Sequence, residues 1–297
     1  MHSDQIHIDA TIARAAISSQ FPEYSGTPVE QVGTVGTVNA IFRIGTSVAA
    51  RFPLRMMDTS ESANMLHSEI LAMRAFAEHS PFATPRPIAI GRPTSRYPMH
   101  WSLQSWIDGD VATPDGLAAS NAFALDIAHL IATLRTIDTK GQTFDRLGRG
   151  GNLADHDDWM DVCFKNSERL LDVPRLRSKW DRLRLLPKID PDVMNHGDLI
   201  PANLLVQGER LVGVLDCGSF GPADPALDLI AFWHLFDSKR REIARARLQS
   251  TPVEWKRGAA WAFQQAMGLV WYYRRSNPAM SDLGRSTLAR IMNAQEI

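Results

Sequence analysis

Four polar residues lie close together in the sequence and have side chains suited to phosphoryl transfer, namely His196, Asp198, Asn203 and Asp216. Asn203 is five positions after Asp198, and Asp216 is eighteen positions after Asp198. An ionised carboxylate only accepts hydrogen bonds, so Asp198 could take the proton of a substrate hydroxyl group. The amide oxygen of Asn203 and the carboxylate of Asp216 are hard oxygen ligands of the kind that Mg²⁺ prefers. This spacing is typical of a kinase active site, in which magnesium is held on the phosphates of ATP.

The segments between these residues predict a β-hairpin. Residues 204–206 and 211–215 are apolar and read as two strands, and residues 207–210 form a polar turn between them. Such a hairpin would bring Asn203, before the first strand, and Asp216, after the second strand, to the same edge.

Two simpler interpretations of this segment remain open. Asp198 and Asn203 could be ordinary turn residues, and Asp216 a loop aspartate; for any one of them alone this is the better interpretation. A metal site built on His196 and Asp198 is a weaker alternative, because the sequence has no second His or Cys pair at the spacing of zinc ligands. The full pattern of motif, strand, turn, strand and Asp-x-Gly favours the kinase interpretation.

The region resembles the aminoglycoside phosphotransferase family of small-molecule kinases. Within residues 193–218 the resemblance rests on His-Gly-Asp-x-x-x-x-Asn and the later Asp-Cys-Gly triplet. It continues through residues 221–229, which read Gly-Pro-Ala-Asp-Pro-Ala-Leu-Asp-Leu. The resemblance implies that Asp198 is the catalytic base and that Asn203 and Asp216 are magnesium ligands.

The same resemblance implies a two-lobed, protein-kinase-like α+β fold. A β-rich N-terminal lobe that binds the nucleotide is expected over residues 1–105, and a mostly helical lobe for catalysis and substrate binding over residues 106–297. Backbone groups near Gln104 and Trp106 would then meet the adenine ring. Trp101 and Trp106 could instead be core residues, and for at least one of them we expect this.

A glycine-containing turn interrupts the predicted strands of residues 29–52. Gly33 and Gly36 lie in it, followed by Thr37 and Asn39. Glycines allow backbone N–H groups to approach phosphates closely, so the turn could cover the phosphates of ATP. The pattern is not a Walker A sequence, and a plain hairpin is the alternative.

Arg51 ends the next predicted strand and is the candidate cation for the phosphates. The helix predicted over residues 60–79 carries Glu69 on its apolar side, in line with Met65, Met73 and Phe76. A carboxylate on an apolar face is costly unless it is paired, so we expect an ion pair between Glu69 and Arg51. Glu69 could instead reach water at the margin of the face, and Arg55 is a second candidate cation.

Two features in the second half of the sequence could bind the molecule that accepts the phosphoryl group. A polar loop that leads into a helix carries four acidic residues, Asp155, Asp157, Asp158 and Asp161. They could attract a cationic substrate, or they could simply favour the helix start. A predicted helix over residues 258–275 is rich in aromatic residues, which are more often core than pocket.

Asp224 and Asp228 have a predicted structural role. The helix expected over residues 226–236 is apolar on most sides and should be buried. A buried carboxylate needs partners, so we expect these two aspartates to brace the catalytic loop.

Composition limits the classes of partner. A formal net charge of −1 argues against a nucleic acid, and no apolar run approaches the ~20 residues that span a bilayer. The N-terminal residues show no secretory signal, and two cysteines form no disulfide framework, so a cytoplasmic protein is expected.

The predicted activity is ATP-dependent O-phosphorylation of a small, hydroxylated and cationic molecule, with an aminoglycoside-type antibiotic as the first choice. Mg²⁺ is the expected cofactor, GTP could replace ATP, and the protein could be a monomer or a dimer. The alternatives are a kinase for a macrolide, a peptide antibiotic or a metabolic alcohol or amine, and a non-catalytic nucleotide-binding protein of the same fold.

Overall fold

The computed structural model describes residues 6–33, 39–146 and 148–297, and it divides into two compact units. The first unit consists of Met1–Glu78, Ala83–Asp108 and Asp216–Gly218. The second consists of His79–Phe82, Gly109–Leu215 and Ser219–Ile297. The chain therefore returns to the first unit for three residues, at the segment that begins with Asp216.

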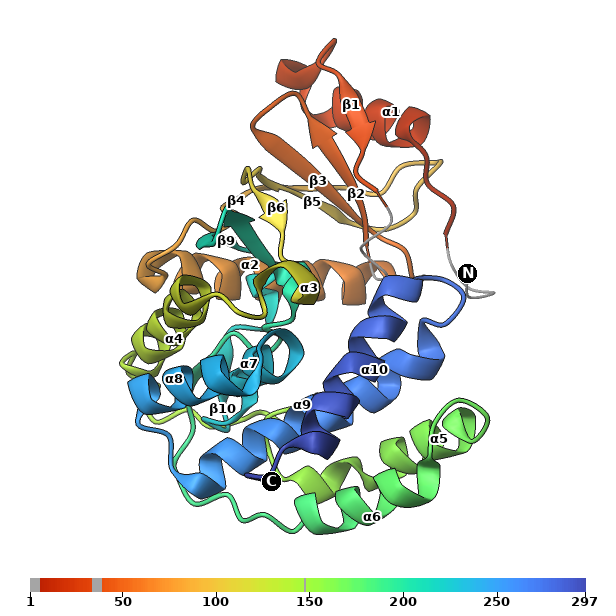
Figure 1. The fold of residues 1–297 in the computed structure, drawn as a ribbon. Helices are drawn as coiled ribbons and strands as arrows, with labels where there is room; N and C mark the ends of the chain where they lie inside the picture. The colour runs from red at the N-terminus through yellow and green to blue at the C-terminus, as the bar shows by residue number, and fades with distance from the viewer. Residues whose placement is uncertain (1–5, 34–38, 147) are drawn as a thin grey trace. The chain divides into compact units, whose positions relative to one another are not determined.

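A five-stranded antiparallel sheet forms the framework of the first unit (Figure 1). Its strands, in spatial order, are β1 (Val29–Gln31), β2 (Asn39–Ile44), β3 (Val48–Pro53), β5 (Trp101–Ser105) and β4 (Pro87–Gly91). Every second residue of β2 is buried, the alternation of a strand with one face on a core. The strands predicted within residues 29–52 and at 101–106 are confirmed.

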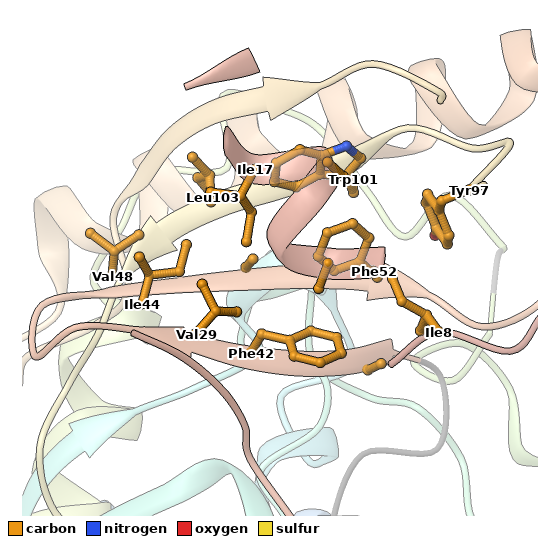
Figure 2. Close-up of a cluster of buried hydrophobic side chains, with 14 of the residues drawn as sticks. Ile8, Ile17, Val29, Phe42, Ile44, Val48, Phe52, Tyr97, Trp101 and Leu103 are labelled. Atoms are coloured by element: carbon orange, nitrogen blue, oxygen red, sulfur yellow. The ribbon is translucent and has the colours of Figure 1, made fainter. Parts of the chain in front are cut away.

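The core of the first unit lies between this sheet and helix α1 (Ala10–Gln20). Asp9 caps the helix by accepting hydrogen bonds from the backbone N–H groups of its first turn. Figure 2 shows Ile17 from the helix beside the large side chains of the strands. Phe52 stacks on Trp101 with 4.6 Å between ring centroids, so Trp101 is a core residue. Gly91 makes room for it, because a Cβ there would lie 2.0 Å from the indole.

Helix α2 (Thr59–His79) completes the first unit. Its buried residues are Ser62, Leu66, Met73 and Phe76. The predicted apolar line therefore holds for Met73 and Phe76, whereas Met65 is only partly buried and Leu66 takes the inner position. Glu69 lies half-buried along the same side.

The second unit is mostly helical and contains two small antiparallel sheets. One sheet consists of β6 (Asp110–Val111), β8 (Leu204–Gln207) and β9 (Arg210–Val214), and the other of β7 (Val193–Asn195) and β10 (Gly221–Ala223). The helices are α3 (Pro114–Leu117), α4 (Asn121–Arg135), α5 (Asp157–Ser167), α6 (Val173–Leu183), α7 (Ile230–Leu235), α8 (Ser238–Leu248), α9 (Pro252–Tyr272) and α10 (Pro278–Asn293). The predicted β8–β9 hairpin is confirmed.

Helix α9 is the central buried element of the second unit. It lies beside α10 in Figure 1, and the two approach closely at Gly284, where a Cβ would meet the carbonyl oxygen of Ala266 at 2.8 Å. Its residues Trp261, Phe263 and Met267 are buried, so these aromatic-helix residues are core, the more common outcome.

The segment predicted as one buried helix over residues 226–236 is split in two. A 3₁₀ turn at Leu227–Leu229 precedes α7, and all residues of α7 are buried, as expected from its composition. No helix among the described residues is long and apolar enough to cross a membrane.

Candidate active site

The β8–β9 hairpin fixes the chain on both sides of its turn. Leu204 pairs with Val214, and beyond this pair the N–H of Leu215 donates to the carbonyl oxygen of Asn203 at 2.8 Å. The predicted hairpin thus brings Asn203 next to the residue that immediately precedes Asp216.

His196 ties the loop of residues 196–203 to the same point. Its Nδ1 accepts the N–H of Asp198 at 3.2 Å, so the proton of the neutral ring lies on Nε2. Nε2 donates to the carbonyl oxygen of Leu215 at 2.8 Å. The conformation of Asp198 and the end of β9 are therefore set by one buried imidazole.

Asp228 holds the start of this loop, as the sequence predicted. Its two carboxylate oxygens accept the N–H groups of His196 at 2.7 Å and of Gly197 at 2.9 Å. Gly197 has φ of +88°, which a side chain would disfavour. Burial raises the pKa of Asp228, and these two N–H groups and the guanidinium of Arg135 oppose the shift.

Asp224 anchors a second loop, which carries Arg149. The N–H of Asp224 donates to the carbonyl oxygen of Gly150 at 2.8 Å, and its carboxylate forms a buried ion pair with Arg257. Arg257 also donates to the carbonyl oxygen of Gly151 at 3.1 Å. Asp224 therefore holds the loop that carries Arg149, with its main partner on α9, and the prediction that it braces the catalytic loop was wrong.

Asp198 has partners on both carboxylate oxygens. Oδ1 accepts hydrogen bonds from Arg149 at 2.6 Å and from Gln265 at 2.7 Å. Oδ2 faces Nδ2 of Asn203 at 3.3 Å. The side chain of Asp198 is 27% exposed, so a substrate hydroxyl group can reach it.

Arg149 and Gln265 are the site residues that sequence reasoning missed. Arg149 lies in a glycine-rich loop without periodicity, and it meets Asp198 from 49 positions away. Gln265 did carry a weak signal, since it is a polar residue within the apolar stretch of residues 258–271, but Gln264 beside it carries the same signal.

Asn203 can offer an oxygen atom to a metal ion. Its Nδ2 donates to the backbone carbonyl of Asp198 at 2.9 Å and faces the carboxylate of the same residue. That arrangement points Oδ1 elsewhere, and no donor among the described residues reaches Oδ1. The amide orientation therefore fits a magnesium ligand.

In the first unit, Arg51 pairs with Asp216 rather than directly with Glu69. Nη2 of Arg51 lies 2.8 Å from Oδ1 of Asp216. Burial alone would lower the pKa of Arg51, but the carboxylates of Asp216 and Glu69 outweigh it and raise that pKa. Burial raises the pKa of Glu69, and Arg51 opposes that shift. The predicted direct pair was wrong because Asp216, which is distant in sequence, takes the guanidinium, while Glu69 acts on it electrostatically.

The Asp-Cys-Gly triplet has a physical requirement at each position. Asp216 has φ of +57°, in the left-handed region. Cys217 is buried, with its sulfur 3.1 Å from Oγ1 of Thr84. A Cβ on Gly218 would lie 3.0 Å from Cγ of Glu69, so glycine allows α2 to approach. The side chain of Asp216 is 49% exposed, and its Oδ2 accepts no hydrogen bond from the described residues, which suits a metal ligand.

The candidate nucleotide residues are only partly within the described chain. Gly33 and Asn39 are described, whereas Gly36 and Thr37 lie outside the described residues. Trp106 is held in the first unit, since its backbone N–H donates to the carbonyl oxygen of Ser47 at 2.8 Å and the guanidinium of Arg43 covers its ring at 4.7 Å.

Gln104 lies on β5 next to this tryptophan. Its Oε1 is buried and has no hydrogen-bond partner among the described residues. A buried acceptor without a donor is costly, so this oxygen is a place where a ligand donor would be favourable.

Arginine already pairs with two of the four acidic residues that could attract a cation. Asp157 accepts hydrogen bonds from Arg184, which lowers its pKa, and Asp161 pairs with Arg177 at 2.6 Å. Asp155 and Asp158 are exposed, and among the described residues neither forms an ion pair with an arginine or lysine. Fewer of these acidic residues are therefore available to attract a cationic molecule than the sequence indicated.

The alternative interpretation of a metal site built on His196 and Asp198 has no geometric support. Among the described residues, no three His, Cys, Asp or Glu side chains are grouped so that they could hold a metal ion. The ring of His196 is instead used on both nitrogens by the backbone.

The sequence matches the family model described as "Phosphotransferase enzyme family" over residues 31–261. A comparison with curated proteins finds no match.

Solved structures with the same fold include aminoglycoside and macrolide phosphotransferases. The GDP complex of aminoglycoside 2'-phosphotransferase-IIIa has a TM-score of 0.70 and 17% identity, over 96% of this chain and 99% of that chain. A GDP and kanamycin complex of APH(2")-IIIa has a TM-score of 0.69 and 18% identity, over 94% and 97%. Macrolide 2'-phosphotransferase MphH from Brachybacterium faecium has a TM-score of 0.60 and 18% identity, over 92% and 97%. The predicted two-lobed, protein-kinase-like fold is confirmed.

The buried His234 should make stability depend on pH. It contacts Thr287 and Gln265, and the charges that act on it are Asp198, Arg149 and Arg290. Burial lowers its pKa from 6.5 to about 4. Between these values the unfolded chain binds a proton that the folded chain does not, so stability falls as pH falls from about 6.5 to about 4. The loss should approach about 3 kcal/mol.

The measurement is denaturant unfolding of the wild-type protein and of His234→Gln at several pH values between 7 and 4. The wild-type protein should lose more free energy of unfolding than the variant, which has no titrating group there. Parallel curves for the two proteins would show that His234 does not set this pH dependence.

Proposed function

Because the chain belongs to the phosphotransferase enzyme family, we propose that it transfers the terminal phosphoryl group of ATP to a hydroxyl group of an aminoglycoside-type antibiotic, inactivating it. The observation that carries this proposal is the geometry around Asp198. An oriented, partly exposed carboxylate lies beside an asparagine whose amide oxygen accepts no hydrogen bond from the residues that the structure describes.

Asp198 is the proposed base. Its ionised carboxylate accepts the proton of the acceptor hydroxyl group as the hydroxyl oxygen forms its bond to phosphorus. The bond between phosphorus and the leaving oxygen of the nucleoside diphosphate breaks in the same process. Arg149, which touches Asp198, keeps a positive charge next to the reacting groups.

Asn203 and Asp216 are the proposed magnesium ligands. Each has an oxygen atom that accepts no hydrogen bond from the described residues, and an amide and a carboxylate are suitable donors. When bound, Mg²⁺ would neutralise negative charge on the phosphates.

The first unit is proposed to hold the nucleotide, which corresponds to the role assigned to residues 1–105, with residues 106–297 for catalysis and the acceptor. Arg51 would contact the phosphates, with Glu69 and Asp216 around it. The turn expected from the sequence, with Gly33, Gly36, Thr37 and Asn39, would cover them, and Gln104 and Trp106 would meet the base. Neighbouring structures hold GDP, ADP or ATP, which supports a nucleotide site and leaves both ATP and GTP as donors to be compared.

A cationic acceptor is proposed from the exposed acidic residues of the second unit. Asp155 and Asp158 have no ion-pair partner within the described part of the chain, whereas Asp157 and Asp161 would contribute only if their arginine partners moved. Structures of similar proteins contain kanamycin and gentamicin, which supports this choice. A cytoplasmic location is part of the proposal, because the proposed donor ATP is plentiful there.

A macrolide kinase is the second candidate. Macrolide phosphotransferases are among the similar structures, and an aromatic surface lies near the acidic residues. Trp159 and Trp271 have ring centroids 5.9 Å apart, and Tyr272 is exposed beside them. Such a surface would suit a large apolar ring system.

Replacing the base should abolish most of the activity. Asp198→Asn keeps the shape of the side chain but removes the proton acceptor, so kcat should fall about 100-fold or more. Initial rates of ADP formation with ATP, Mg²⁺ and the acceptor would measure it. Asp190→Asn, an exposed aspartate in the same unit, is the matched control and should be unaffected. Unchanged turnover in Asp198→Asn would disprove the proposed mechanism and favour a non-catalytic protein.

Loss of a magnesium ligand should raise the Mg²⁺ requirement. In Asp216→Asn and Asn203→Ala, the Mg²⁺ concentration for half-maximal rate should increase by about 10-fold or more, since even outer-shell changes cost that much. Glu23→Gln, an exposed charge change in the first unit, is the control. A Mg²⁺ titration that is the same in all three variants and the wild type would contradict these assignments.

An acceptor panel should separate the two candidate substrates. With kanamycin, gentamicin, streptomycin and a macrolide offered in turn, we expect phosphorylation of at least one aminoglycoside, detected by mass spectrometry. For that acceptor, the double variant Asp155→Asn/Asp158→Asn should raise KM and leave kcat unchanged, because lost charge attraction weakens binding. Turnover of the macrolide alone would reject the aminoglycoside assignment.

A further inference from the structure

The two oxygen atoms of the Asp198 carboxylate have unequal surroundings. Oδ1 accepts two short hydrogen bonds, from Arg149 and from Gln265. Oδ2 has a single and longer contact with Nδ2 of Asn203 at 3.3 Å. Oδ1 is therefore the anchored oxygen, and Oδ2 keeps the capacity to accept another proton.

The direction of the hydrogen bonds behind Gln265 follows from the charge on Asp198. An ionised carboxylate has no hydrogen to donate, so Gln265 must present its NH₂ group to Asp198 and its Oε1 to the opposite side. That Oε1 lies 3.0 Å from Nε2 of His234, which must then carry the proton. Nδ1 of His234 is left as an acceptor and lies 2.8 Å from the hydroxyl oxygen of Thr287. Each hydrogen bond thus points from Thr287 toward Asp198.

The three hydrogen-bonded side chains of Thr287, His234 and Gln265 are shielded from water. Thr287 and His234 are 0% exposed and Gln265 is 8% exposed. They come from three helices, α10, α7 and α9, so the movement of one segment cannot shift all three side chains together. Burial also lowers the pKa of His234 to about 4, which keeps the ring neutral and its tautomer fixed near pH 7.

We propose that Gln265, oriented by His234 and Thr287, is a positioning residue that fixes the rotation of the Asp198 carboxylate and so makes Oδ2 the oxygen that receives the acceptor proton. The inference rests on the proposed function. The terminal torsion of an aspartate is broad, so the loop backbone alone does not determine which oxygen faces the hydroxyl group. A donor on Oδ1 removes that freedom, and small errors in the geometry of a base are costly in rate.

Variants of two neighbouring glutamines test the proposal. Gln265→Met keeps the length of the side chain without a donor, and Gln265→Glu keeps its shape but offers only acceptors when ionised. Gln264→Met is the matched control, because Gln264 is 5% exposed and precedes Gln265 on the same helix. Rates are measured on the full chain with ATP, Mg²⁺ and kanamycin. Both Gln265 variants should lower kcat about 10- to 100-fold, with little change in either KM, while Gln264→Met keeps the wild-type kcat.

A second measurement does not depend on turnover. ¹⁵N NMR of the imidazole of His234 in the wild-type protein at pH 7 should show a protonated Nε2 and an unprotonated Nδ1. The opposite tautomer, or a charged ring, would overturn the proposal. So would an unchanged kcat in Gln265→Met, an equal loss in Gln264→Met, or an effect confined to KM.

The Asp198→Asn variant separates this proposal from the function on which it rests. If Asp198→Asn is as active as the wild type, or if the wild type turns over no acceptor, the proposed function fails. If Asp198→Asn is inactive and Gln265→Met is fully active, the proposed function stands and only the positioning role is rejected.

Discussion

A carboxylate that serves as a base must be ionised, oriented and reachable, and these requirements conflict within a helical core. Burial favours the neutral form, whereas full exposure leaves the side chain free to rotate. The protein meets these requirements at Asp198 in two ways. Donors from distant segments bind one carboxylate oxygen, and the side chain remains partly exposed, so the other oxygen can be reached. Asp228 holds the loop that carries Asp198, and His234 and Arg257 hold the segments that carry the two donors.

Two buried carboxylates, those of Asp228 and Asp224, support this arrangement at different places. Asp228 accepts both N–H groups at the start of the catalytic loop, and so fixes the backbone from which Asp198 projects. Asp224, through Arg257, holds the carbonyl groups of the loop that carries Arg149. Buried ion pairs such as this one add little net stability, because desolvation offsets the attraction between the charges. Their value here is geometric: two loops far apart in sequence are held where their side chains can meet.

Local patterns in the sequence predicted a large part of this arrangement, and contacts between distant residues account for what was missed. The β8–β9 hairpin followed from apolar runs around a polar turn, and the buried α7 from its composition. The partner of Arg51 was predicted wrongly, because Asp216 lies 165 positions away and no periodicity connects the two. Gln265 was missed for a related reason: Gln264 has the same side chain and nearly the same burial, and only the position of Asp198 in space distinguishes them.

The acidic residues before and within α5 show why the acceptor is harder to infer than the chemistry. Acidic residues at a helix start are favoured by the helix dipole whether or not they bind a substrate. Here Arg177 of α6 pairs with Asp161, and Arg184 at the end of α6 pairs with Asp157, so part of the apparent charge serves the packing of two helices. The residues that handle phosphate and proton are constrained by backbone contacts, and such constraints leave a motif. A surface that recognises an acceptor is constrained only by the shape and charge of that acceptor, and it can change without disturbing the loops behind it.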